Sequence, residues 1–174
     1  MINCCKVRAM TAADLPMVLE WRNHPEVRRF MFTQHEITLT EHSNWFERAN
    51  QENTRRLLII EENSHAIGYV QFTNVGPEGI ADWGFYARPD SPKGTGKKLG
   101  FAALDHGFRM LKLHKVCGQA IASNAASIRF HERLGFTREA ELRDQKFINN
   151  QYENLICFGL LANEWQAQVD GEIQ

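Results

Sequence analysis

Residues 80–113 constrain the fold more than any other part of the chain, because a strand pattern, a glycine-containing loop and an amphipathic helix follow one another there. Residues 80–87 are rich in apolar and aromatic side chains, and residues 88–97 contain two prolines and two glycines. Apolar side chains then recur at helical spacing through residues 101–111. The sequence therefore predicts a strand, a loop of phosphate-binding size and a helix, in that order.

The loop is suited to an anion. Gly94 and Gly96 carry no Cβ, and the first N–H groups of the following helix point outward without partners. Lys93, Lys97 and Lys98 add positive charge. We therefore expect a phosphate-bearing ligand at this loop, with an ordinary turn between strand and helix as the alternative.

Two common phosphate-binding motifs do not fit. A nucleoside-triphosphate P-loop requires Ser or Thr after Gly-Lys, whereas Lys98 follows Gly96 and Lys97 here. A dinucleotide fingerprint requires Gly-x-Gly-x-x-Gly, and the spacing from Gly96 to Gly100 is one residue too long. Both ATP and NAD are therefore disfavoured as ligands.

The rest of the chain supplies further strand and helix patterns. Strands are expected at residues 3–8, 57–61, 66–73, 115–122, 136–142 and 152–161, and helices at residues 11–24, 40–49 and 124–135. With residues 80–113, this predicts a mixed α/β fold with a mostly antiparallel seven-stranded sheet and about four helices. We expect one domain, residues 1–165, and a frayed tail at residues 166–174.

Composition excludes several partners. Lys and Arg number 20 against 21 Asp and Glu, for a formal charge of −1, so no basic field favours nucleic acid. No apolar run is long enough to cross a bilayer, and the N-terminus has no signal-peptide pattern, so we expect a cytoplasmic protein without a membrane partner. The four cysteines have no metal-binding spacing, and we expect reduced thiols and no metal.

The order of elements, with Lys-Gly-Thr-Gly at residues 93–96 and Asn-x-x-Ser-x-x-x-His-Glu-x-Leu-Gly-Phe at residues 124–136, resembles the Gcn5-related N-acetyltransferases. The resemblance implies acetyl-CoA as cosubstrate. It also implies that pantetheine pairs with the strand before the loop, where Gly84 is consistent with a bulge. The cofactor residues implied are Phe85, Tyr86, Ala87, Ser91, Lys93, Gly94, Thr95, Gly96, Lys97, Asn124 and Ser127; Ser91 replaces the usual Arg or Gln.

The front third of the chain narrows the resemblance. Trp-Arg-Asn-His-Pro at residues 21–25, Phe-Met at residues 30–31 and Thr-Glu-His at residues 40–42 are similar to nucleotide-sugar N-acetyltransferases of pseudaminic acid biosynthesis. These enzymes acetylate the 4-amino group of a UDP-linked amino-dideoxy sugar. The acceptor residues implied are Arg22, His24, Met31, His42, Thr73 and Asn74.

Other functions stay open at this point. Acetyltransferases that act on the N-termini of ribosomal and other proteins also carry Trp-Arg-Asn, and a CoA-binding module without turnover has the same loop. A homodimer is kept as a candidate assembly.

Direct transfer of acetyl from a thioester to an amine requires a neutral amine and a proton for the departing thiolate. His131 stands where many family members have a proton-donating Tyr, so we predict that it is the acid. Asp82 shares a strand face with Tyr86 and is the candidate base, acting directly or through water.

Overall fold

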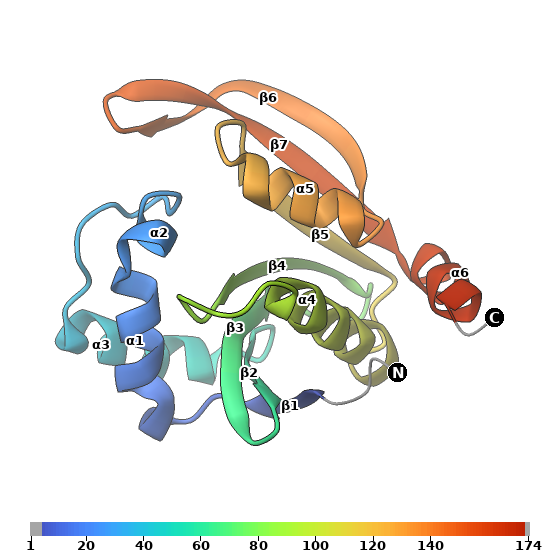
Figure 1. Ribbon diagram of the computed structural model, residues 1–174, viewed down its shortest axis with the longest axis horizontal. Helices are drawn as coiled ribbons and strands as arrows, with labels where there is room; N and C mark the ends of the chain where they lie inside the picture. Colours follow the sequence, from blue (N-terminus) through green and yellow to red (C-terminus); the bar gives the residue numbers. More distant parts are fainter. Residues whose placement is uncertain (1–4, 173–174) are drawn as a thin grey trace.

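The structure is a computed structural model that describes residues 5–172. Its seven strands form one sheet in the order β1-β2-β3-β4-β5-β7-β6 (Figure 1). The strands are β1 Cys5–Ala9, β2 Arg56–Glu62, β3 His65–Thr73, β4 Ile80–Ala87, β5 Lys115–Ile121, β6 Thr137–Ile148 and β7 Gln151–Leu161. Every neighbouring pair is antiparallel except β4 and β5. The predicted mostly antiparallel, seven-stranded α/β fold is therefore confirmed.

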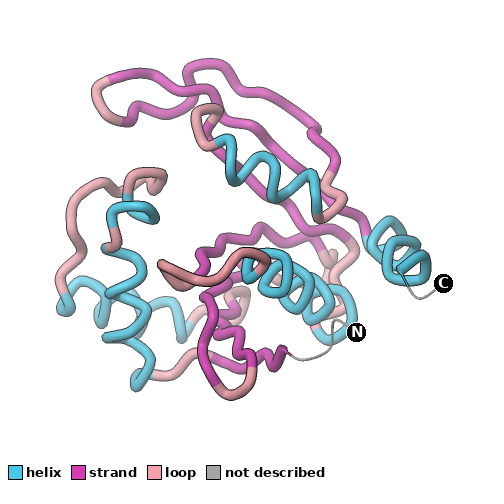
Figure 2. Tube along the Cα trace, viewed as in Figure 1, coloured by secondary structure: helices cyan, strands magenta, loops and turns pink. Residues whose placement is uncertain are grey.

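Six α-helices accompany the sheet in the described part of the chain, where about four were predicted. They are α1 Leu15–Asn23, α2 Pro25–Arg28, α3 Leu39–Gln51, α4 Thr95–Asp105, α5 Ala125–Arg133 and α6 Ala162–Glu172. A 3-10 turn at Ala12–Asp14 precedes α1, and a π-helical turn at His106–Met110 continues α4. Figure 2 shows that loops connect α2 to α3 and β4 to α4. Within residues 5–172, no helix combines the length and apolar composition needed to cross a bilayer.

Helices cover both faces of the first strands. The larger core packs α4 and α5 against one face, around Phe72, Trp83 and Leu104. The smaller core packs α1 and α3 against the other face of β2 and β3, around Val18 and Ile59. This double cover explains why residues 57–60 of β2 are all buried and all apolar instead of alternating.

β4 and β5 separate after a short paired stretch. They pair only through Ile80–Asp82 and Lys115–Cys117, and β4 then continues beside β3 alone. The Arg88 N–H donates to the Ile67 carbonyl at 2.8 Å, which fixes the alternation of the β3–β4 ladder. That alternation directs the backbone groups of Phe85 and Ala87 away from β3 and towards the opening between β4 and β5.

The bulge expected at Gly84 is absent from the β3–β4 pairing. The register runs without a shift from Gly68 opposite Ala87 to Thr73 opposite Asp82. The backbone of β4 is accessible because β5 diverges from it, so no irregularity within β4 is needed.

The helices expected at residues 40–49 and 124–135 are present, and local caps define their ends. Thr38 and Glu41 form a capping box at the start of α3, and the Asn124 side chain accepts a hydrogen bond from the Ser127 N–H at 3.1 Å at the start of α5. Gly135, with φ of 84°, follows the end of α5.

The predicted frayed tail is wrong for residues 166–172, which belong to α6. Trp165 and Val169 are one helical turn apart and are 3% and 7% exposed. The Trp165 ring packs on Phe101 and Phe108, with centroid distances of 4.8 and 6.0 Å. Residues 173–174 of the expected tail lie outside the described residues. The same holds for residues 3–4 of the expected first strand, which include Cys4.

Candidate active site

Two cavities meet at the C-terminal part of β4, where this strand is no longer paired with β5. The first, which we call the α3 cavity, has a volume of about 480 Å³ and lies between α1, α3, β3, β4 and the loop after α2. The second, the α5 cavity, has a volume of about 450 Å³ and lies between α2, β4, α4 and α5. Both are lined by Phe30, Met31, Phe85 and Tyr86. A group bound in one cavity can therefore reach a group bound in the other across a single strand.

The α5 cavity contains the cofactor residues that the sequence placed on β4, α4 and α5. The predicted residues that line it are Phe85, Tyr86, Ala87, Gly96, Asn124 and Ser127. The first turn of α4 begins after Gly94, whose φ of 94° favours glycine, and its N–H groups supply the partial positive charge that attracts phosphate.

The other predicted loop residues support the loop and do not line the cavity. The Ser91 hydroxyl donates to the Arg88 carbonyl at 2.6 Å, and the buried Thr95 hydroxyl donates to the Pro92 carbonyl at 2.8 Å. Both hydroxyls therefore hold the loop in shape. Lys93 is exposed on the loop and Lys97 in the first turn of α4, so both place positive charge near the α4 N-terminus.

The α3 cavity is marked by two basic groups with unmet hydrogen bonds. Arg22 donates through Nη2 to the Thr33 carbonyl at 3.1 Å, while its buried Nη1 has no partner among residues 5–172. His42 is 5% exposed, and its Nε2 likewise lacks a partner in the described structure. Burial lowers the pKa of both groups, and the charge of Arg22 lowers the pKa of His42 further. Such groups cost free energy unless a ligand or water satisfies them.

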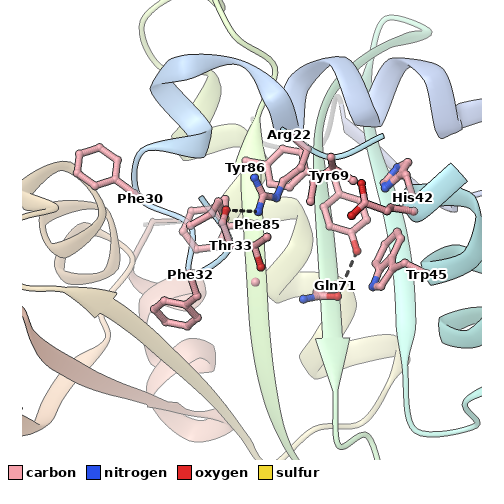
Figure 3. A pocket seen from close by; sticks show the side chains of 14 residues that line it. Arg22, Phe30, Phe32, Thr33, His42, Trp45, Tyr69, Gln71, Phe85 and Tyr86 are labelled. Carbon is pink, nitrogen blue, oxygen red and sulfur yellow. Dashed lines mark hydrogen bonds between the residues drawn. The ribbon is translucent and has the colours of Figure 1, made fainter. Parts of the chain in front are cut away.

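Aromatic side chains form the wall beside these groups (Figure 3). The His42 and Trp45 rings stack at 5.1 Å, and the Tyr69 and Tyr86 rings lie 5.0 Å apart. The Tyr69 hydroxyl donates to Gln71 Oε1 at 3.2 Å. Burial raises the pKa of both tyrosines, so both phenols remain neutral at physiological pH.

Trp45, Tyr69 and Gln71 also line the α3 cavity and were not predicted as site residues. Tyr69 pairs with Tyr86, and Gln71 with Gly84, so the β3–β4 register is the signal that would have found two of them.

Glu41 is the one carboxylate among the residues that line the α3 cavity. It accepts hydrogen bonds from the Thr38 N–H at 2.7 Å and the Thr38 hydroxyl at 2.8 Å, and His35 lies 3.0 Å away. These contacts lower the pKa of Glu41 to about 2. Glu41 is therefore ionised at physiological pH, with its oxygens bonded at the start of α3, and the lining sets two basic side chains, Arg22 and His42, against this one carboxylate.

Several predicted residues lie outside both cavities. His24 accepts a hydrogen bond from the Glu26 N–H at 3.4 Å and caps α2. Asn74 donates to Asp82 Oδ2 at 2.7 Å, and Thr73 is opposite Asp82 in the sheet. Neither cavity is lined by these residues. The predicted acceptor roles of His24, Thr73 and Asn74 and the predicted base role of Asp82 are not supported by their positions.

The predicted acid role of His131 is contradicted by its surroundings. The side chain is 0% exposed and lines neither cavity. Its Nε2 accepts from Trp83 Nε1–H at 3.1 Å, so its Nδ1 carries the proton and donates to the Ser127 carbonyl at 2.8 Å. Burial lowers its pKa to about 4. A buried neutral imidazole with both nitrogens bonded has no proton to give a thiolate.

We expect His131 to affect stability through pH instead. Its pKa falls from 6.5 in the unfolded chain to about 4 in the folded protein, so between these values only the unfolded chain binds the proton. Stability should therefore fall as pH falls through this window, by about 1.4 kcal/mol per pH unit and about 3 kcal/mol in total. His131→Gln, which keeps an acceptor for Trp83 but does not titrate, should lose this component in urea unfolding measured from neutral to acidic pH.

His65→Gln is the matched control, because His65 is exposed on β3 and its removal should leave the pH dependence intact. An equally steep pH dependence in wild type and His131→Gln would show that His131 is not buried in the neutral form.

Two cavities on either side of one strand, one of them at a helix N-terminus suited to phosphate, fit an enzyme that transfers a group between two substrates. Within the described part of the chain, no group of three His, Cys, Asp or Glu side chains is arranged to hold a metal ion. Residues 6–137 match the family described as an acetyltransferase (GNAT) domain. The chain belongs to this family, and the predicted N-acetyltransferase class is confirmed.

The names of individual relatives do not agree on one acceptor: one names spermidine and another names none. The chain is 24% identical to Acetyltransferase PseH of Campylobacter jejuni over 83% of its own length and 90% of the relative. It is 26% identical to spermidine N(1)-acetyltransferase of Escherichia coli K12 over 94% of its length and 89% of the relative. A crystal structure of Vibrio cholerae spermidine N-acetyltransferase with CoA and spermine superposes with a TM-score of 0.86, at 22% identity, covering 94% and 99% of the two chains. These similarities do not decide the acceptor.

Proposed function

We propose that this protein transfers the acetyl group of acetyl-CoA to the 4-amino group of a UDP-linked amino-dideoxy sugar, with both substrates bound at once. One observation carries the choice of acceptor: in the α3 cavity, Arg22 and His42 each have a buried nitrogen that finds no partner among residues 5–172. An acceptor with phosphate groups would satisfy both.

The α5 cavity supports acetyl-CoA as the donor. The outward-facing backbone of Phe85 and Ala87 offers hydrogen bonds to the amides of pantetheine, in the manner of an added strand. Gly96 and the first turn of α4 offer backbone N–H groups to the pyrophosphate. In this arrangement the thioester lies near Phe85 and Tyr86, where the two cavities meet.

The α3 cavity favours an anionic acceptor over a polyamine. Spermidine carries several positive charges at neutral pH and would need carboxylates, whereas the lining provides Arg22 and a single, engaged carboxylate, Glu41. Arg binds phosphate through a fork of donors, and the rings of Trp45 and Tyr69 provide flat apolar surface for a base or sugar. The resemblance in residues 21–42 points to the same class of acceptor.

The chemistry requires few groups from the protein. The neutral amine attacks the thioester carbonyl, the C–N bond forms, the C–S bond breaks, and the proton lost by the amine balances the proton gained by the thiolate. Holding amine and thioester together at Phe85 and Tyr86 supplies up to about 7–11 kcal/mol by orientation. With His131 in the core, we assign solvent the transfer of both protons.

The proposal is tested by measuring CoA release with acetyl-CoA and three acceptors: a UDP-4-amino-4,6-dideoxy sugar, spermidine, and a peptide with a free N-terminus. We expect kcat/KM to be at least ~10²-fold higher for the sugar nucleotide. Spermidine and the peptide amine are cationic and cannot make the charged contacts that phosphates make with Arg22 and His42. Preference for spermidine or the peptide would overturn the choice of acceptor. Binding of acetyl-CoA without turnover of any amine would identify a binding module.

A further inference from the structure

We propose that His42 takes up a proton when the phosphates of an acceptor enter the α3 cavity, which makes it a specificity-determining residue for anionic acceptors. This inference rests on the proposed function, because it requires an acceptor that carries phosphate. The affinity for this acceptor then depends on pH, and protonation of the His42 imidazole causes that dependence.

His42 is held in position to respond to a ligand. Its ring stacks on Trp45 at 5.1 Å with an interplanar angle of 13°, so its orientation is fixed by packing. Its side chain is 5% exposed and lines the α3 cavity, and its Nε2 has no hydrogen-bond partner among residues 5–172. Arg22 reaches the same cavity from α1, and its Nη1 is equally unsatisfied. Figure 3 shows these two side chains entering from different helices.

The charges around His42 favour the neutral ring while the cavity is empty. From α1, the Arg22 guanidinium opposes a second positive charge, and burial acts in the same direction on the His42 pKa. From β3 and β4, Tyr69 and Tyr86 contribute neutral phenols. On α3 itself, Glu41 is negative but is bound to Thr38.

A phosphate reverses this balance. An anion between Arg22 and His42 favours the charged imidazolium over the neutral ring, so the pKa of His42 rises on binding. Proton uptake occurs between the His42 pKa of the free protein and that of the complex, and affinity should increase as pH falls through this interval. A cationic acceptor has the opposite effect on the ring and gains nothing from the proton.

Calorimetry can count this proton. UDP-N-acetylglucosamine is the probe, because its phosphates are diesters whose charge is constant near neutral pH and it has no amine to acetylate. Titrations at one neutral pH in buffers with different ionisation enthalpies give the number of protons taken up from the slope of the observed enthalpy. We expect wild type to take up a large part of one proton, and His42→Gln to bind more weakly with uptake near zero. His35→Gln is the matched control, since it removes an exposed imidazole beside Glu41 and should keep the uptake.

The outcomes separate this inference from the proposed function. Binding by wild type without proton uptake, or uptake unchanged in His42→Gln, would overturn the role of His42 and leave the nucleotide-sugar proposal standing. Loss of proton uptake in His35→Gln would assign the proton to His35 and would also overturn the role of His42. If wild type binds no uridine nucleotide at millimolar concentration, the proposed acceptor class itself is wrong.

Discussion

Gly96→Asp is expected to abolish the binding of acetyl-CoA and the rise in melting temperature that acetyl-CoA gives the wild-type protein. Gly96 lies in the first turn of α4 and lines the α5 cavity, so the new carboxylate would occupy the place of the pyrophosphate. The stabilisation lost is about 2.7 kcal/mol when the ligand is at 100 times its Kd. ATP and NAD at the same concentration should not stabilise wild type, because the loop lacks the motifs that they require.

The substitution should spare the fold, which makes the loss specific to binding. A Cβ at Gly96 would lie 3.5 Å from the Phe130 ring, an ordinary contact, and a carboxylate in the first turn of a helix is favourable. Gly76→Asp is the matched control: it adds the same side chain in the turn before β4, outside both cavities. Undiminished stabilisation of Gly96→Asp by acetyl-CoA would show that the cofactor binds elsewhere.

Arg22→Ala is expected to raise KM for the sugar nucleotide by about 10- to 150-fold, which corresponds to about 1.5–3 kcal/mol for lost charged hydrogen bonds. KM for acetyl-CoA should change little, since Arg22 lines only the α3 cavity. Steady-state kinetics with each substrate varied in turn measures the separation. Stability should fall only by about 1 kcal/mol for the lost bond from Nη2 to the Thr33 carbonyl, because Nη1 has no partner within the described residues.

Arg48→Ala is the matched control for charge, since Arg48 is exposed on α3 and lines neither cavity. Arg22→Lys should recover part of the affinity, because it restores the charge without the fork of donors. An unchanged KM for the sugar nucleotide in Arg22→Ala, with a raised KM for a peptide, would favour the N-terminal acetyltransferase alternative.

Local chemistry made most of the fold predictable. Capping by Thr38 and Asn124 and the helix end at Gly135 depend on neighbours in the sequence, so the helices at residues 40–49 and 124–135 could be predicted from local patterns. Two features depend on distant contacts and were missed. The helix at residues 162–172 is defined by Trp165 packing on α4, and β6 extends to residue 148 although it is an edge strand whose residues are mostly exposed and follow no apolar pattern.

In the candidate site, too, features set by neighbouring residues could be predicted, whereas those set by distant contacts could not. The cofactor loop is local, so Gly94 and Gly96 could be identified from spacing and their freedom from a Cβ. His131 was assigned by its position in a motif and Asp82 by the strand face that it shares with Tyr86, but partners from other parts of the chain decide the environment of both side chains. Trp83, 48 residues away, donates a hydrogen bond to His131 inside the core, and Asn74 donates one to Asp82, which lines neither cavity.

The separation of β4 from β5 has a consequence for the behaviour of the protein in a crowded solution. Each strand has an unpaired edge beyond Asp82 and Cys117, and exposed edges of this kind recruit other chains and start aggregates. Here the two edges face each other in the middle of the sheet, with α2, α4 and α5 around the opening. The backbone groups of these edges can therefore bind an extended thioester ligand. Other protein chains cannot pair with them as they could with an exposed strand at the outer edge of a sheet.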